Sequence, residues 1–162
     1  MKIKALFFIL FLLLVGCSRA GEEHSNKFKL GNLDTSVFSN QKNYFIVTPF
    51  EWVGKKPVTI ESVELVTKDD MSINAEQAPI RYTFYGADPK KGVGIYQRDD
   101  LGDLEDIQGF ELKGEGRLVL KVSMNEVRPD PNRRIKIKYI IGQKKHEQLL
   151  ESNMIEQLRT EE

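Results

Sequence analysis

Acidic side chains are concentrated in one short stretch of this chain, and their oxygens could bind a metal ion. The stretch contains five carboxylates: Asp99, Asp100, Asp103, Glu105 and Asp106. Loop carboxylates are typical calcium ligands, but Ca²⁺ takes roughly six to eight oxygens, and this spacing does not follow the EF-hand pattern. Leu101 and Leu104 also interrupt the run. We therefore expect a solvated acidic loop that binds little or no metal, and a calcium site built on Asp99, Asp100 and Asp103 is the alternative.

Histidine and cysteine are too scarce to build most catalytic or metal sites. The chain has two histidines, His24 and His146, and one cysteine, Cys17. A zinc site made of such ligands needs roughly three or four of them, and a Ser-His-Asp triad would need one of the two histidines. The chain has no Gly-x-Ser-x-Gly elbow, no phosphate-binding loop and no dinucleotide fingerprint. We predict no cofactor and no enzyme activity; a hydrolase that uses two carboxylates is the alternative from the enzyme class.

Aromatic side chains are crowded into one segment that ends at a turn. The segment contains Tyr44, Phe45, Phe50 and Trp52 and is followed by Gly54. Trp and Tyr are favoured at binding hot spots, so Trp52, Tyr44 and Phe50 are candidate contact residues. The alternative, which we favour, is that Trp52 packs in the core under the turn that follows it.

The N-terminus has the organisation of a secretory signal peptide. Two lysines in the first four residues precede an apolar run, residues 5–15, that is shorter than the roughly 20 residues of a membrane-spanning helix. The next residues, Leu14-Val15-Gly16-Cys17, resemble the lipobox of bacterial lipoproteins. The resemblance implies attachment of a diacylglyceryl group to the Cys17 sulfur and cleavage after Gly16. It also implies a protein that is lipid-anchored to the bacterial cell membrane, with its domain on the extracytoplasmic side.

The remaining chain is organised as one domain on a tether. We expect a removed signal peptide at 1–16, the lipidated cysteine and a flexible tether at 17–27, a β-domain at 28–152, and a short helix or frayed tail at 153–162. The 24 basic and 24 acidic side chains balance, which leaves no broad basic field for nucleic acid or anionic lipid. The basic run at 133–145 is interpreted as a solvated face.

Apolar residues alternate with polar ones in several segments, as in half-buried antiparallel strands. The alternation is clearest at 80–84, 118–124 and 135–141, and 43–50 is also a predicted strand that Pro49 ends or places at a sheet edge. In 58–66 the pattern changes phase near Glu61, which predicts a β-bulge. Shorter strands are predicted at 94–97, 107–112 and 146–150, and a loop is predicted at 113–116.

Seven or eight short strands with little helix predict an all-β fold, an antiparallel β-sandwich. Residues 54–65 and 116–122 resemble strands of bacterial immunoglobulin-like domains, and the resemblance implies that topology without implying an activity. In the tail, Asn153 and Glu156 have the spacing of a capping box, which predicts a short C-terminal helix with Met154, Ile155 and Leu158 on one face.

These features predict a membrane-anchored surface lipoprotein that acts as a non-enzymatic interaction module. Its expected partners are the membrane, through the N-terminal lipid, and an envelope protein or wall component, with no role for nucleic acid. The alternative is a small-ligand or ion-binding accessory lipoprotein of an envelope complex. A deep pocket with converging polar groups would favour the accessory lipoprotein, and an exposed apolar patch would favour the interaction module.

Overall fold

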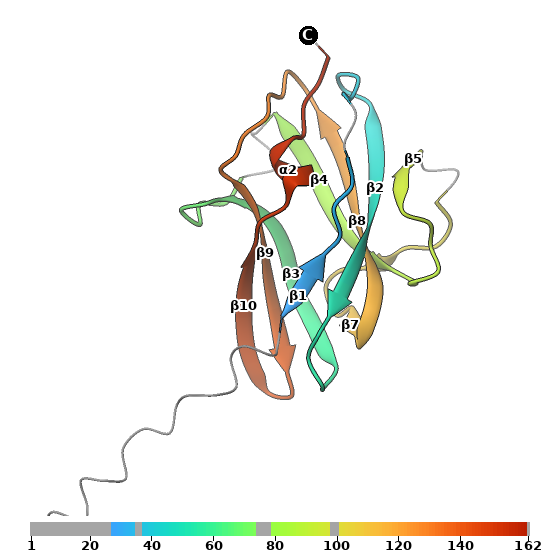
Figure 1. The fold of residues 1–162 in the computed structure, drawn as a ribbon, viewed down its shortest axis with the longest axis vertical. Helices are drawn as coiled ribbons and strands as arrows, with labels where there is room; N and C mark the ends of the chain where they lie inside the picture. The colour runs from blue at the N-terminus through green and yellow to red at the C-terminus, as the bar shows by residue number, and fades with distance from the viewer. Residues whose placement is uncertain (1–26, 35–36, 74–78, 98–100, 162) are drawn as a thin grey trace, which may run out of the picture.

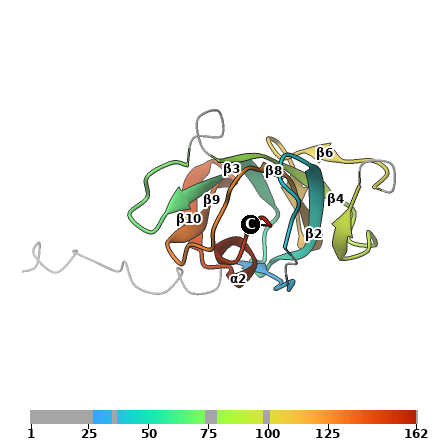
Figure 2. The same cartoon turned by 90° about the horizontal axis from the view of Figure 1, so that it is seen from above.

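Two antiparallel β-sheets pack face to face around the main apolar core (Figure 1, Figure 2), which confirms the predicted all-β sandwich. The computed structural model describes residues 27–34, 37–73, 79–97 and 101–161. The predicted signal peptide, Cys17 and His24 lie outside the described residues, as do Asp99 and Asp100. Within the described part of the chain, no helix is long and apolar enough to cross a lipid bilayer.

The first sheet has the strand order β1-β2-β8-β4-β6, and β5 also pairs with β2. Its strands are β1 (Phe28–Leu30), β2 (Asn43–Trp52), β4 (Ile80–Ala87), β5 (Gly94–Tyr96), β6 (Glu105–Asp106) and β8 (Gly114–Met124). The second sheet has the order β10-β9-β3-β7. Its strands are β3 (Val58–Thr67), β7 (Glu111–Leu112), β9 (Arg133–Ile141) and β10 (Lys144–Leu150).

The described residues contain ten strands, where seven or eight were predicted. β1, β6 and β7 have only two or three residues each, and a segment that short cannot show a period of two. The predicted bulge in β3 is confirmed, because the register with β9 shifts between Ile60 and Ser62. β8 begins at Gly114, so the loop predicted at 113–116 is wrong. β10 begins at Lys144 because a two-residue turn, in which Gly142 has a φ of 64°, closes the hairpin early.

Pro49 lies inside β2, which continues to Trp52, so the predicted strand end at Pro49 is wrong. β1 pairs with residues 50–52 of β2 and β5 pairs with residues 45–47 of the same strand. Pro49 falls between these two stretches, and its carbonyl accepts a hydrogen bond of 2.9 Å from the Gly31 N–H. The N–H and C=O of a strand residue point to the same side, so the missing donor of proline faces a local edge of the sheet.

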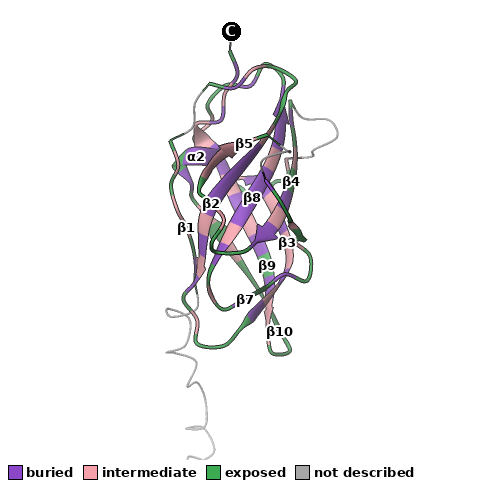
Figure 3. Ribbon diagram, turned by 90° about the vertical axis from the view of Figure 1, so that its right-hand side faces the viewer, coloured by how far each residue is buried: buried purple, intermediate pink, exposed green. Residues whose placement is uncertain are grey.

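The main core lies between the two sheets and includes buried side chains from β2, β3, β4, β8 and β9. Leu120 on β8 and Ile137 on β9 are 1% and 0% exposed, which confirms that both face the core. Figure 3 shows buried residues along β2 and β8. The alternation of buried and more exposed residues along β9 follows the period of two expected for a sheet with one solvated face.

The C-terminal tail packs against the sandwich and contains the predicted short helix, so the alternative of a frayed tail is wrong for its described residues. Helix α2 (Asn153–Glu156) begins after Ser152, and no side chain caps it, so the predicted capping box is also wrong. The predicted apolar face is confirmed, because Met154, Ile155 and Leu158 are all buried in the main core. The Arg133 guanidinium holds the tail by donating to the carbonyls of Ile155 at 3.3 Å and Leu158 at 3.0 Å.

Candidate functional site

A second apolar cluster lies on the outer face of the first sheet, away from the main core. It consists of Phe45, Val47, Ala87, Leu101 and Val119. Four of these residues come from β2, β4 and β8, and Leu101 comes from the connection between β4 and β7. We call residues 88–97 and 101–106 of this connection the flap. The flap covers part of a sheet face that would otherwise be solvated.

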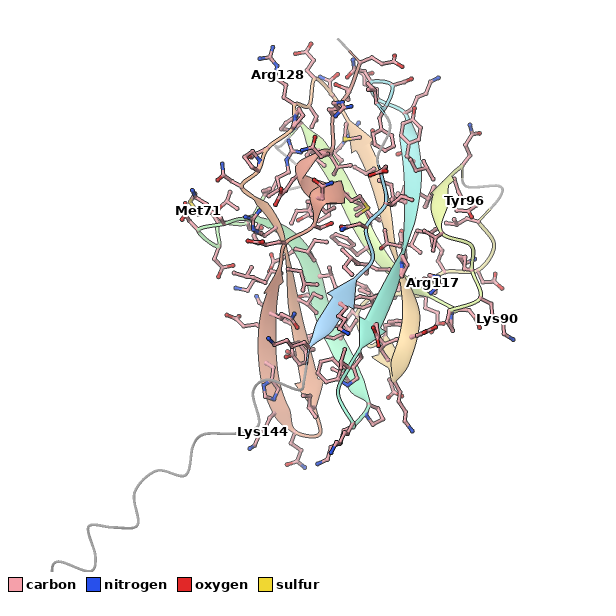
Figure 4. All side chains as sticks on the ribbon, in the orientation of Figure 1. Met71, Lys90, Tyr96, Arg117, Arg128 and Lys144 are labelled. Atoms are coloured by element: carbon pink, nitrogen blue, oxygen red, sulfur yellow. The ribbon has the colours of Figure 1, made fainter. Side chains whose placement is uncertain are left out.

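The flap is attached to the sheet by apolar residues, of which Leu101 is the most buried, and by hydrogen bonds. Leu101 is only 2% exposed, although it lies in the acidic stretch. The Arg117 Nε on β8 donates to the carbonyl of Lys91 at 2.9 Å, and the Lys91 ammonium donates to the carbonyl of Leu101. Figure 4 shows Arg117 between β8 and the part of the flap that carries Lys90 and Tyr96. Strands β5 and β6 add backbone pairing to β2 and β4.

Beyond the edge of the flap, the same sheet face forms a half-open pocket with a volume of about 440 Å³. Its lining residues are Asn43, Phe45, Tyr85, Leu104 and Lys121. Phe45, Lys121 and Thr83 form one cross-strand row over β2, β8 and β4. Side chains directly opposite each other in neighbouring strands share a face, so this row defines the sheet side of the pocket.

Lys121 is the cation of this pocket. Its Nζ lies 5.9 Å from the centroid of the Phe45 ring, within the range of a cation–π contact. No salt bridge joins Lys121 to another residue that the structure describes. A second exposed cation, Arg81, lies in the adjacent cross-strand row with Ser123. An ammonium beside aromatic and aliphatic walls suits an anionic group that is attached to an apolar body.

The outer face of the second sheet carries most of the basic run 133–145, and four of its cations, Arg134, Lys136, Lys138 and Lys145, are paired with carboxylates. The Lys136 ammonium donates to the Asp70 carboxylate at 2.6 Å and contacts Glu147 at 3.3 Å, and the hydrogen bond to Asp70 is the main cause that raises the pKa of Lys136. Three further pairs lie on the same face: Lys145–Glu61, Lys138–Glu64 and Arg134–Glu156. This face is therefore largely neutralised. Arg133 is the one buried cation of the run, which corrects the interpretation of the whole run as solvated.

The aromatic residues that were proposed as contact residues lie outside the pocket around Lys121. Trp52 and Phe50 point from β2 into the main core, where they are 2% and 1% exposed, and the Trp52 Nε1 donates to the Lys56 carbonyl at 2.7 Å. They are core residues, as the alternative for Trp52 expected, and their candidacy as contact residues is corrected. Tyr44 is half-buried and packs edge-on against Phe38, with 4.8 Å between the ring centroids.

The acidic stretch is divided between buried and exposed positions. Asp103, Glu105 and Asp106 are exposed, and β6 is formed by the last two of these residues.

Among the described residues, no three His, Cys, Asp or Glu side chains lie close enough to hold a metal ion. His146 is on β10, stacked on Tyr139 with 5.4 Å between the ring centroids.

Neither Lys121 nor Tyr85 was among the predicted site residues, although both occupy outward positions of alternating strands. Their alternation with core residues could have indicated exposure. No local signal could have shown that Phe45, Tyr85 and Leu104 meet around Lys121.

Comparison with known proteins leaves the site to be interpreted from its own geometry. No protein-family model matches this chain, and no curated protein is significantly similar to it. The fold and the site define a β-sandwich domain with a partly covered outer sheet face and a half-open pocket that contains one lysine.

Proposed function

We propose that this protein is a lipid-anchored, extracytoplasmic interaction module that binds its partner on the open part of the first sheet's outer face. The observation that carries the proposal is the position of Lys121, a cation without an ion pair to any described residue, inside a pocket with aromatic walls. Binding there would give the ammonium an anionic partner and cover the exposed edges of Tyr85 and Leu104. The partner would be an envelope protein or wall component that presents an anionic group.

The proposed anchor rests on the residues Leu14-Val15-Gly16-Cys17. Two or three acyl chains would hold the protein stably, because each buried CH₂ adds about 0.8 kcal/mol. Cys17→Ala should therefore move the protein from the membrane fraction to the soluble extracytoplasmic fraction or leave it as an unprocessed precursor. Normal processing together with unchanged membrane association would refute the anchor.

The binding face can be tested in cells with a photo-crosslinking amino acid at Thr83, which is exposed and directly opposite Lys121. The matched control places the same amino acid at Lys138, an exposed position on the outer face of the second sheet. We expect a discrete adduct from Thr83, none from Lys138, and loss of the Thr83 adduct when Lys121→Glu is added. An adduct that persists with Lys121→Glu would show that the pocket is not the binding site.

The pocket volume also supports a second candidate, a small-ligand-binding accessory lipoprotein. A volume of about 440 Å³ lies within the range of roughly 300–1,000 Å³ that is typical of small-molecule sites. A ligand that binds only the folded state raises the melting temperature. Melting the protein with a set of aromatic and aliphatic carboxylates, in parallel with Lys121→Glu, tests this function. A shift that requires Lys121, together with no crosslinked adduct at Thr83, would favour the small ligand.

A further inference from the structure

The turns at one end of the sandwich, together with the strand residues beside them, carry a group of six lysines. We call this group the basic end; it consists of Lys27, Lys55, Lys56, Lys113, Lys144 and Lys145. These residues are distant in sequence and come from the start of the described chain, the β2–β3 turn, the β7–β8 link and the β9–β10 turn. Their common position is a result of strand pairing alone.

The register of the strands places these turns together. Phe28 pairs with Trp52, and the Val53 N–H donates to the Lys27 carbonyl at 3.0 Å, so β1 begins where β2 ends. Trp52 also pairs with Gly114, which puts Lys113 at the same end. Thr59 near the start of β3 pairs with Ile140 near the end of β9, which brings the two lysine-bearing turns side by side. Figure 4 shows Lys144 at this end and Arg128 at the opposite end.

The positive charge of the basic end is only partly compensated, because the exposed Glu111 and Glu115 lie two residues on either side of Lys113. Lys145 pairs with Glu61 at 2.7 Å, and no salt bridge joins the other five lysines to a residue that the structure describes. Lys27, Lys55, Lys56, Lys113 and Lys144 are all exposed. Val53 lies among them and is 42% exposed, because its neighbour Trp52 occupies the core position. The basic end thus combines clustered positive charge with one exposed apolar side chain.

The opposite end of the sandwich has no such excess. The turns there carry Lys42, Lys68 and Arg128, and they also carry Asp69, Asp70 and Glu126. A domain with balanced net charge therefore has one strongly basic end and one mixed end. Positive charge is therefore distributed unevenly along the long axis of the domain.

We propose that the basic end binds the anionic phospholipid headgroups of the membrane to which the protein is anchored. The proposal rests on the lipid anchor under "Proposed function". Cys17 precedes Lys27 by ten residues, and such a segment spans at most about 35 Å when fully extended. The chain enters the domain at the basic end (Figure 1), so the anchor brings this end to the membrane first.

Lysines near an anionic surface are attracted to it over about one Debye length, which is about 10 Å at 0.1 M salt. The lipid anchor supplies a high local concentration, so the headgroup contact can be weak and still be populated. In this orientation the pocket around Lys121 faces sideways, parallel to the membrane, and the C-terminal end points away from it. Docking of the basic end would therefore fix how the binding face is presented.

The test uses the whole chain downstream of the predicted cleavage site, without lipid, as Cys17→Ser. The measurement is co-sedimentation with vesicles of phosphatidylglycerol mixed with phosphatidylcholine, and with vesicles of phosphatidylcholine alone. The triple variant Lys55→Glu, Lys56→Glu and Lys144→Glu is compared with a control that makes the same charge change at the opposite end, Lys42→Glu, Lys68→Glu and Arg128→Glu. Both variants must melt at the temperature of the parent chain.

We expect binding only to the phosphatidylglycerol vesicles, a decrease of at least about tenfold in the basic-end variant, and retention of most binding in the control. High salt should abolish the binding, because it screens exposed charges. Equal losses in both variants, or equal binding to phosphatidylcholine alone, would overturn the proposal. Binding to soluble polyphosphate without binding to vesicles would also overturn it, in favour of a polyanionic partner. The chain carries no lipid in this assay, so a failure here is distinct from a failure of the Cys17→Ala fractionation.

Discussion

The side-chain amide of Gln148 on β10 forms two hydrogen bonds with the backbone of Phe28 on β1. The Phe28 N–H donates to the Gln148 Oε1 at 2.8 Å, and the Gln148 Nε2 donates to the Phe28 carbonyl at 3.1 Å. β1 and β10 are edge strands of different sheets, so this amide acts as a peptide group would and joins the two edges. Unpaired edges are sites of aggregation and strand exchange, and this contact closes one of them.

Gln148→Leu should destabilise the fold by about 1–3 kcal/mol, because it leaves both polar groups of Phe28 unpaired in a half-buried position. Urea unfolding measures the loss. Gln143→Leu in the exposed β9–β10 turn is the matched control and should change stability by less than about 0.5 kcal/mol. Equal effects of the two substitutions would show that the amide contact between β1 and β10 does not stabilise the fold.

Tyr82→Phe should cost about 1–3 kcal/mol at neutral pH, because the Tyr82 hydroxyl joins two segments of the chain. It accepts from the Leu65 N–H at 3.1 Å and donates to the Ile73 carbonyl at 3.2 Å. Tyr85→Phe, whose ring lies on the outer face of the same strand, should have little effect. Chemical denaturation compares the two variants, and a negligible loss in Tyr82→Phe would contradict the structural role of the hydroxyl.

The same residue predicts a loss of stability at alkaline pH. Burial raises the pKa of Tyr82 above its ordinary value of 10.0. A raised pKa means that the unfolded chain releases the phenol proton more readily than the folded one, so stability falls as the pH rises above 10.0. Melting curves across this range should show a smaller alkaline decline in Tyr82→Phe than in the parent chain. An identical decline would mean that Tyr82 does not contribute to it.

Leu101→Ala should release the flap without unfolding the sandwich. Leu101 is the flap residue buried in the outer cluster, and truncation of a buried leucine costs about 2–5 kcal/mol. Hydrogen–deuterium exchange should therefore accelerate in residues 88–97, while β9 keeps its protection. The half-buried Leu104 provides the control, and Leu104→Ala should have a smaller effect. Uniform acceleration across both sheets would show that the flap and the sandwich unfold together.

Ile137→Ala and Leu120→Ala should each destabilise the protein by about 2–5 kcal/mol, because both side chains are fully enclosed in the main core. Leu149 on β10 is 46% exposed, and Leu149→Ala should cost much less. Denaturant midpoints give the comparison. Similar costs at Leu149 and Ile137 would contradict the assignment of the core faces.

The sequence by itself was sufficient for the long strands and their faces. Side chains alternate strictly along a strand, so the pattern of Leu118 to Met124 predicts that Leu120 is buried, and the phase change in 58–66 predicts the bulge. Local patterns failed where non-local contacts decide the outcome. Strands of two or three residues have no measurable period, and the tail becomes ordered only because the end of the core accepts Met154 and Leu158.

The electrostatic organisation was decided by the tertiary structure alone. Counted along the chain, the 24 basic and 24 acidic side chains cancel, and the longest basic run is 133–145. In the folded protein most cations of that run are paired with carboxylates across the strands. The lysines without an ion pair to a described residue, Lys144 among them, come from turns and strand ends that are far apart in sequence. Which turns meet depends on strand order and register, and the pocket around Lys121 depends on them in the same way. A linear sequence specifies which groups are charged, but only the pairing of strands determines which charges become neighbours.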